Sequence, residues 1–224
     1  MEGRRRVRDF LSGRSVDRAP FLPLVTDFAA RLEQVSCEER LAADPQALTR
    51  TLAGAQALFG LDAVVLTVER AQLAAAVETV QRLRVLLGER AALVVLLPGP
   101  ELELANAIGL QHVDALGVIA DEAGPERLTP LWNVARYYAA PSLLVCPRGS
   151  TDSARGGADA VAVWAGATAE ELLAAGARRV GVAIAPGGEP PPLPPGGFYT
   201  TAGELPAGTD VEWFHRIARE AAAG

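Results

Sequence analysis

Carboxylate side chains stand at the ends of three separate apolar runs, and they are the first candidates for chemistry. Asp27, Glu69 and Asp121 each end such a run or directly follow it. A carboxyl group there can act as a general acid or base, or accept an N–H group from a ligand. If the three share one site, mutual repulsion and partial desolvation raise their pKa values. We predict them as catalytic residues with Glu69 at the centre; the alternative is solvated carboxylates or helix N-caps.

Four further polar residues at the ends of apolar runs are predicted to bind substrate. Thr26 comes directly before Asp27, and Glu204 follows the last run of the chain. Cys146 can supply a thiolate that is favoured by the nearby Arg148. The Arg148 guanidinium can also hold an anionic group. The alternatives are that Cys146 packs as a small hydrophobic residue and that Arg148 belongs to a surface turn.

The residue types that are absent exclude several familiar chemistries. All 21 basic residues are arginines, and the chain contains only two histidines. A Walker-type phosphate loop, a Schiff-base aldolase and a pyridoxal-phosphate enzyme each need a lysine amine, so these classes are excluded. Zinc sites built on several histidines, including HExxH proteases, are excluded as well. No GxSxG or GxGxxG motif occurs in the sequence.

Composition indicates an ordinary globular protein of the cytoplasm. The 224 residues are 50% hydrophobic and 21% charged, with a formal net charge of −6. An acidic balance disfavours nucleic acid as a partner, and no apolar run is long enough to cross a membrane. The polar N-terminus does not resemble a signal peptide. Two distant cysteines are typical of cytosolic thiols rather than of a disulfide framework.

Eight apolar runs alternate with stretches that favour helix. The runs, which are continuous and so typical of strands covered on both faces, span 21–27, 62–68, 91–98, 113–121, 141–147, 158–164, 178–186 and 197–203. Helices are expected at 44–60, 79–89, 100–109, 126–139, 167–176 and 209–224, and a stiff proline-rich loop at 186–197. This order predicts an α/β fold, a compact single-domain (β/α)8 barrel over residues 1–224 with eight parallel strands. An open doubly wound sheet is the alternative.

Capping residues mark the ends of two of these helices. Asp44 followed by Pro45 is typical of an N-cap and first helical position, and Gly60 is typical of the stop. Thr168 followed by Glu171 has the spacing of a capping box.

Four segments resemble the uroporphyrinogen decarboxylase superfamily, which joins porphyrinogen decarboxylases with zinc-dependent cobamide methyltransferases. The first, 6–32, has a basic stretch followed by Asp-Arg-Ala-Pro entering the first strand. Segment 44–69 contains Leu-Phe-Gly-Leu-Asp-Ala before the second strand, and 88–100 is similar to the third strand with its Gly-Pro turn. Segment 196–221 is similar to the last strand, its Pro-x-Gly-Thr turn and the closing helix. The resemblance implies a (β/α)8 barrel and either decarboxylase or methyltransferase chemistry.

The decarboxylase pattern is kept only in part. Arg18 and Pro20 match the entry to the first strand, but the family's arginine pair for substrate carboxylates is missing from 25–29. An octa-acid tetrapyrrole therefore lacks its bidentate partners. The decarboxylases have an aspartate that accepts hydrogen bonds from the pyrrole N–H groups of the substrate. By the resemblance, Glu69 stands at the position of that aspartate. The amino-acid sequence of the first strand is more similar to the methyltransferase branch than to the decarboxylase branch.

The zinc ligands of the methyltransferase branch are also incomplete. The resemblance implies a His-x-Cys on the fifth strand and a cysteine after the eighth. Here Cys146 is kept, but Leu144 replaces the histidine and Gly203 stands at the position of the late cysteine. Three protein ligands are the usual minimum for zinc. We therefore expect no metal and no bound cofactor.

Three functions remain open at this point. The first is a decarboxylase-like or methyltransferase-branch protein that acts on, or binds, a tetrapyrrole or corrinoid. The second is a non-catalytic barrel that binds a small-molecule ligand or a corrinoid protein. The third is an independent enzyme that uses the Glu69, Asp27 and Asp121 carboxylates on a small substrate. Whether the protein is an enzyme is left open by the sequence.

Overall fold

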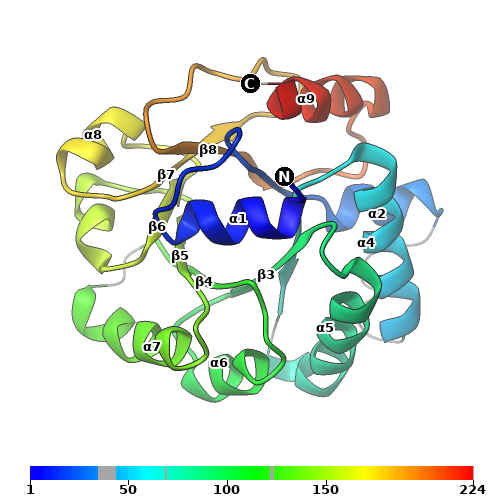
Figure 1. Ribbon diagram of the computed structural model, residues 1–224, viewed down its shortest axis with the longest axis horizontal. Coiled ribbons are helices and arrows are strands. Elements are labelled where there is room, and N and C mark those ends of the chain that lie inside the picture. The colour runs from blue at the N-terminus through cyan, green and yellow to red at the C-terminus, as the bar shows by residue number, and fades with distance from the viewer. Residues whose placement is uncertain (35–43, 69, 122–123, 224) are drawn as a thin grey trace.

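The protein is built on eight parallel strands that follow one another around a barrel (Figure 1). The computed structural model describes residues 1–34, 44–68, 70–121 and 124–223. Its strands are β1 (Phe21–Leu24), β2 (Ala63–Thr67), β3 (Ala92–Leu97), β4 (Ala115–Ile119), β5 (Ser142–Cys146), β6 (Ala160–Val163), β7 (Val180–Ile184) and β8 (Gly197–Glu204). All eight predicted runs contain a strand.

The sheet closes almost completely on itself. Hydrogen-bonded neighbours run in the order β1-β8-β7-β6-β5-β4-β3-β2, which leaves β1 and β2 as the two ends of the sheet. These two strands lie side by side, so the ring is nearly closed. The predicted single-domain (β/α)8 barrel is confirmed, and the alternative of an open doubly wound sheet was wrong.

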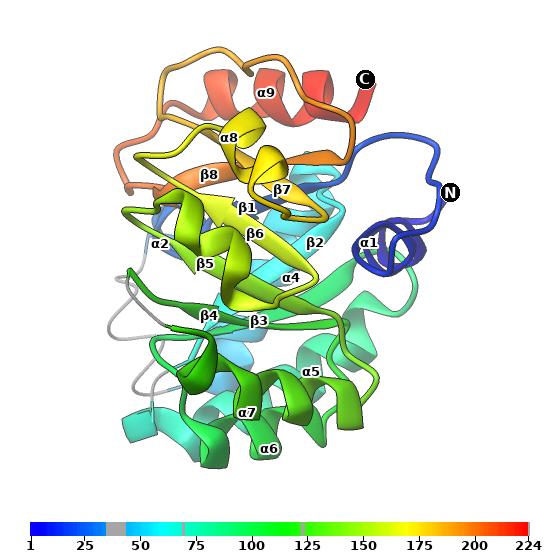
Figure 2. The ribbon, with the colours of Figure 1, turned by 90° about the vertical axis from the view of Figure 1, so that its left-hand side faces the viewer.

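Helices cover the outside of the barrel and close one of its ends (Figure 2). They are α1 (Gly3–Leu11), α2 (Thr26–Leu32), α4 (Pro45–Phe59), α5 (Leu73–Leu87), α6 (Leu102–Gly109), α7 (Pro125–Tyr137), α8 (Ala169–Ala174) and α9 (Val211–Ala223), with short 3-10 helices η1 (Arg70–Gln72) and η2 (Thr151–Gly156). In the part of the chain that the structure describes, no helix is both long and apolar enough to span a bilayer.

The predicted caps are confirmed. The Asp44 carboxylate accepts backbone N–H groups at 2.9 and 3.1 Å, and Gly60 ends α4 in the left-handed conformation with φ of 64°. Thr168 and Glu171 form a complete capping box at α8.

Two of the connections between strands lack the α-helix that a regular (β/α)8 barrel has there. Only η2 links β5 to β6, as the short spacing there suggests. Between β7 and β8 the chain runs through the proline-rich loop without a helix, and the Tyr199 hydroxyl donates to the Pro191 carbonyl at 3.1 Å. These savings let a 224-residue chain complete a fold that typically takes about 250 residues.

Small residues line the N-terminal end of the barrel interior, and α1 fills the space they leave. Ala63, Ala92, Ala115 and Ala160, each at or near the start of its strand, face inward together with Phe198. Val7 and Phe10 of α1 pack into this cluster, with the Phe10 and Phe198 rings edge to face at 5.9 Å. Figure 1 shows α1 lying across this end of the barrel.

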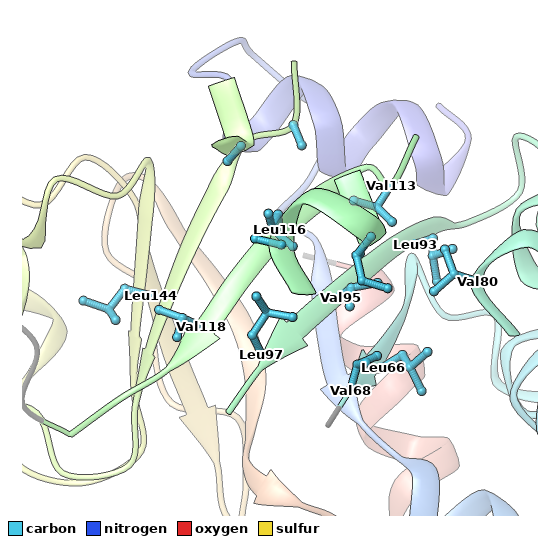
Figure 3. Close-up of a cluster of buried hydrophobic side chains, with 14 of the residues drawn as sticks. Leu66, Val68, Val80, Leu93, Val95, Leu97, Val113, Leu116, Val118 and Leu144 are labelled. Carbon is cyan, nitrogen blue, oxygen red and sulfur yellow. The ribbon is translucent and has the colours of Figure 1, made fainter. Parts of the chain in front are cut away.

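The alternate residues of each strand face outward and form a second apolar layer with the helices. Leu66 of β2, Leu93 of β3 and Leu116 of β4 belong to one buried cluster that also contains Val80 of α5 (Figure 3). Because both faces of the strands are apolar, their sequences do not alternate in polarity.

Three aspartates, of which Asp62 and Asp114 are buried and Asp159 is partly exposed, connect neighbouring strands at the N-terminal end. Asp62, directly before β2, accepts from Arg6 at 2.5 Å, from Arg18 at 2.7 Å and from the Phe21 backbone N–H at 3.1 Å. Asp114, directly before β4, accepts from Arg4, Arg84 and the Leu93 N–H. Asp159, directly before β6, accepts the Ser142 N–H at 2.9 Å. Each carboxylate thus joins the start of an even-numbered strand to the start of an odd-numbered one.

Candidate functional site

We call the end of the barrel at which the parallel strands finish, opposite α1, the C-terminal mouth (Figure 2). Barrel enzymes place their chemistry at this end. The last inward-facing residues of β2 and β4, Thr67 and Ile119, and Trp164, which directly follows β6, are half-buried there. The next inward residues down, such as Val65 and Ala162, are fully buried. The half-buried residues therefore form the floor of the mouth.

Glu204 lies on the wall of the mouth, where β8 ends beside β1. It stands opposite Leu24 in the strand register. Its carboxylate accepts the backbone N–H of Asp27 at 3.0 Å and hydrogen bonds from the backbone and hydroxyl of Thr26. Those two residues begin α2, so Glu204 satisfies N–H groups that the helix leaves unpaired. The structure brings together three predicted residues: Thr26, Asp27 and Glu204.

The surroundings of Glu204 raise the pKa of its carboxyl group to about 7. Burial is the largest cause because it disfavours the charged form, and the negative charge of Asp27 acts in the same direction. The hydrogen bonds from Thr26 and Asp27 favour the carboxylate and oppose the shift only in part. A carboxyl group with this pKa is present in both protonation states near neutral pH, as a proton donor or acceptor requires.

Asp121 and Arg148 form a second polar pair at the mouth. The Arg148 backbone N–H donates to the Asp121 carboxylate at 2.7 Å, which joins the ends of β4 and β5. Both side chains are exposed. Because β2 and β3 separate β4 from β1, Asp121 does not neighbour Asp27, and the carboxylate next to Asp27 is that of Glu204. The carboxylate pair at the mouth is thus Asp27 with Glu204 instead of Asp27 with Asp121.

The Cys146 thiol faces away from the barrel interior. Its side chain belongs to the outer apolar layer with Leu144 and Val163, and it is 2% exposed. Burial raises the pKa of the thiol, a hydrogen bond with Ser153 lowers it, and the charge of Asp121 raises it. Both the placement and the raised pKa favour a packed thiol over a reactive or substrate-binding one.

Glu69, which was predicted as the centre of the site, lies outside the described residues. Thr67, two positions earlier, is half-buried at the floor of the mouth.

The residues present do not fit the zinc that the methyltransferase resemblance implies. Leu144 and Cys146 both point into the outer apolar layer. Gly203 adopts φ of +99°, a conformation that a cysteine at this position would strain. Among the described residues, no three His, Cys, Asp or Glu side chains lie close enough together to hold a metal ion. No step of the account below passes through zinc.

Sequence reasoning named Glu204 only as a substrate-binding residue and did not identify it as the titrating group. Its raised pKa depends on burial and on Asp27, which is 177 residues away in the chain. No local sequence signal reports that contact. Gly203 beside it, whose positive φ suits glycine, was recognised only as a missing cysteine.

Comparison with known proteins places the fold. No family model and no curated protein matches the chain. Among solved structures, it is similar to a methyltransferase from Methanosarcina mazei, with a TM-score of 0.73, 15% identity and full coverage of both chains. It is also similar to a mandelate racemase/muconate lactonizing enzyme from Jannaschia sp. CCS1, with a TM-score of 0.55, 17% identity, and coverage of 89% of this chain and 59% of that one.

A mandelate racemase/muconate lactonizing enzyme from Sulfitobacter sp. gives a TM-score of 0.51 at 14% identity, over 78% of this chain and 50% of that one. At these identities the likeness establishes the fold alone. The chain is an α/β barrel of the same architecture as these enzymes, and it matches the methyltransferase over its whole length.

Proposed function

We propose that this chain is a compact member of the uroporphyrinogen decarboxylase superfamily that binds a tetrapyrrole-related ligand, in particular a corrinoid, at its C-terminal mouth. The observation that carries the proposal is the enclosed Glu204 carboxyl, with a pKa of about 7, beside Thr26 and Asp27. The full-length fold match to a methyltransferase and the sequence resemblance at both ends of the chain support the choice of ligand class.

Glu204 has the properties needed to exchange a proton with a bound ligand. In its charged form it accepts an N–H group, and in its neutral form it donates a proton or a hydrogen bond. The N–H groups at the start of α2 hold the carboxyl in place in either form. Burial, and to a smaller extent the charge of Asp27, disfavours the charged form and keeps the two forms close in free energy near pH 7.

Uroporphyrinogen itself is a poor candidate substrate. The segment 25–29, where the decarboxylases place their arginine pair, reads Val-Thr-Asp-Phe-Ala and contributes Asp27 instead. Carboxylates on a ligand would meet a negative charge there rather than a guanidinium. We expect negligible conversion of uroporphyrinogen to coproporphyrinogen.

A non-catalytic ligand-binding barrel is the second candidate. The observation that favours it is the replacement of the zinc-binding pattern by Leu144 and by Gly203 with its positive φ. In this case Glu204 hydrogen-bonds to the ligand without transferring a proton.

A spectral titration with dicyanocobinamide, together with an assay for uroporphyrinogen decarboxylation, tests the proposal. We expect binding of dicyanocobinamide, and Glu204→Gln weakens it at least about tenfold, or ~1.4 kcal/mol. Glutamine keeps the acceptor for the Asp27 N–H but cannot titrate. Glu170→Gln, which removes an exposed carboxylate on α8, is the matched control and binds as the wild type does.

Two results would contradict the proposal. One is that dicyanocobinamide does not bind, and the other is that Glu204→Gln binds it as tightly as the wild type. A methyl-transfer or decarboxylation rate that falls in Glu204→Gln by much more than the affinity for dicyanocobinamide favours the enzyme over the non-catalytic barrel.

A further inference from the structure

Strands β1 and β8 lose their common register just before they reach the C-terminal mouth. Leu22 lies opposite Thr200. Leu24, two residues further along β1, lies opposite Glu204, which is four residues further along β8. Two regular parallel strands advance in step, so Ala202 would otherwise stand opposite Leu24. Strand β8 therefore contains a bulge of two additional residues, and a bulge at the rim of a barrel changes where the following side chain points.

Gly203 gives the bulge its backbone shape. Its φ of +99° is a conformation that residues with a side chain rarely adopt. A Cβ atom at this position would lie 3.8 Å from the ring carbons of Trp164, which is an ordinary contact distance. The backbone angle, and not a lack of space, is therefore what requires glycine directly before Glu204.

The side chain of Thr201 closes the bulge with two hydrogen bonds. Its hydroxyl oxygen accepts the backbone N–H of Leu24 at 3.0 Å, and the hydroxyl donates to the Gly203 carbonyl at 2.6 Å. Thr201 is 1% exposed, so solvent does not compete for either bond. One hydroxyl group thus connects the bulge of β8 to the residue of β1 that stands opposite Glu204.

The same residue of β1 also holds the chain on the other side of Glu204. The Leu205 N–H donates to the Leu24 carbonyl at 2.9 Å. Leu24 is therefore bonded to Thr201 before Glu204 and to Leu205 after it. Between these two bonds the Glu204 carboxylate reaches the Asp27 N–H at 3.0 Å. Because a hydrogen bond weakens steeply when its geometry changes, the contact with α2 depends on the bulge keeping its shape.

We propose that Thr201 is a positioning residue, whose hydroxyl fixes the bulge of β8 and so holds the Glu204 carboxyl against the start of α2. The inference rests on the proposed function, because Thr201 acts on the ligand site only through Glu204. A purely structural role differs from this one in a measurable way. In that case the loss of the hydroxyl lowers stability, but Glu204 keeps its surroundings.

Carbon-13 NMR of the Glu204 carboxyl as a function of pH, without any ligand, tests the proposal. Thr201→Val keeps the shape of the side chain and removes the hydroxyl. Burial is the largest cause of the raised pKa of Glu204, so a carboxyl that leaves its enclosed place ionises more easily. We expect its midpoint to fall from about 7 to about 6 or lower in Thr201→Val. In Thr201→Ser, which keeps the hydroxyl, the midpoint stays near 7.

Thr200→Val is the matched control. The buried Thr200 hydroxyl donates to the Leu22 carbonyl at 2.9 Å, before the bulge begins. The same substitution there removes a hydrogen bond between the same two strands, so it lowers stability against urea but leaves the Glu204 midpoint near 7. Gly203→Ala strains the bulge and keeps all its hydrogen-bonding groups. It lowers the midpoint as Thr201→Val does, and it decides the question if Thr201→Val does not fold.

The outcomes separate this inference from the proposed function. A Glu204 midpoint near 7 in Thr201→Val or in Gly203→Ala refutes the positioning role, as does an equal fall in Thr200→Val, and each of these leaves the proposed function standing. A midpoint that falls in Thr201→Ser refutes the hydroxyl as the positioning group. If the wild type does not bind dicyanocobinamide, the proposed function is refuted, whereas a fall confined to Thr201→Val and Gly203→Ala still supports the positioning of Glu204 by Thr201.

Discussion

The two ends of the barrel place carboxylates in opposite electrostatic surroundings. At the N-terminal end, Asp62 and Asp114 are buried, and each is bonded to arginines and to a backbone N–H. At the C-terminal mouth, Glu204 is enclosed beside another carboxylate, Asp27, and has no arginine partner in the described residues. The same chemical group therefore serves stability where a countercharge faces it and titrates near neutral pH where none does.

Removing the Asp62 charge tests the N-terminal end and has the largest expected effect. Asp62→Asn leaves the buried Arg6 and the adjoining Arg18 without their shared carboxylate, so it lowers the free energy of unfolding by about 3–5 kcal/mol. Urea denaturation measures the loss. The control Asp152→Asn breaks an exposed ion pair with Arg155 and costs less than about 1 kcal/mol. Equal losses in the two variants would contradict the structural role of Asp62.

Truncating the residue that fills the N-terminal end has the next largest effect. Phe10→Ala empties the space between the small residues of the strands and removes the ring contact with Phe198, which lowers stability by about 3 kcal/mol. The exposed Leu58→Ala is the control, with a change within about 0.5 kcal/mol. Because α1 lies opposite the mouth, Phe10→Ala keeps its affinity for dicyanocobinamide. A variant as stable as the wild type would mean that α1 does not fill this end.

Glu204→Gln sharpens the comparison because it changes stability in the opposite direction. The folded-state pKa of about 7 lies above the ordinary value of 4.5, so the neutral form is favoured in the folded protein. The resulting stability is fully present below about pH 4.5 and is lost as the pH rises through 7. At about pH 8 Glu204→Gln is therefore more stable than the wild type by about 1–3 kcal/mol, whereas at about pH 4 the two are similar.

Urea denaturation of both proteins across this pH range measures the difference. The titration of Asp17 lies outside this pH range. Arg6 holds the pKa of the Asp17 carboxyl below its usual range, so the stability that Asp17 contributes is lost only below about pH 4. Glu170→Gln, which removes an exposed carboxylate, is the control and shows no comparable gain at about pH 8. A pH-independent gap between Glu204→Gln and the wild type would mean that Glu204 does not titrate in this range.

Most of the fold could be predicted from the sequence because strands buried on both faces leave long apolar runs, and capping residues mark the helices between them. The prediction failed where contacts between residues far apart in the sequence determine the secondary structure. Residues 26–27 were predicted as strand, yet they begin α2, because Glu204 from the last strand pairs with the N–H groups there. Helix α5 begins at Leu73, six residues before the predicted start, and no cap in the sequence marks that boundary.

The candidate site was predicted less completely, for two physical reasons. The direction in which Cys146 points could not be read from β5, because every residue of that strand is buried and both faces are apolar. The raised pKa of Glu204 and its place opposite Leu24 depend on how β1 and β8 adjoin in the ring, and local sequence does not encode this. Barrel proteins place functional residues at the carboxyl ends of their strands, and this rule correctly predicted that Thr26, Asp27 and Glu204 lie at the C-terminal mouth. It could not predict which of them titrates near neutral pH.

The central claim is that the C-terminal mouth holds a carboxyl group tuned to exchange protons near neutral pH. Carbon-13 NMR of the side-chain carboxyl of Glu204, assigned with Glu204→Gln and followed as a function of pH, measures its pKa directly. The account predicts a midpoint near 7, which falls when Asp27→Asn removes the neighbouring charge. A midpoint near the ordinary 4.5 would contradict it.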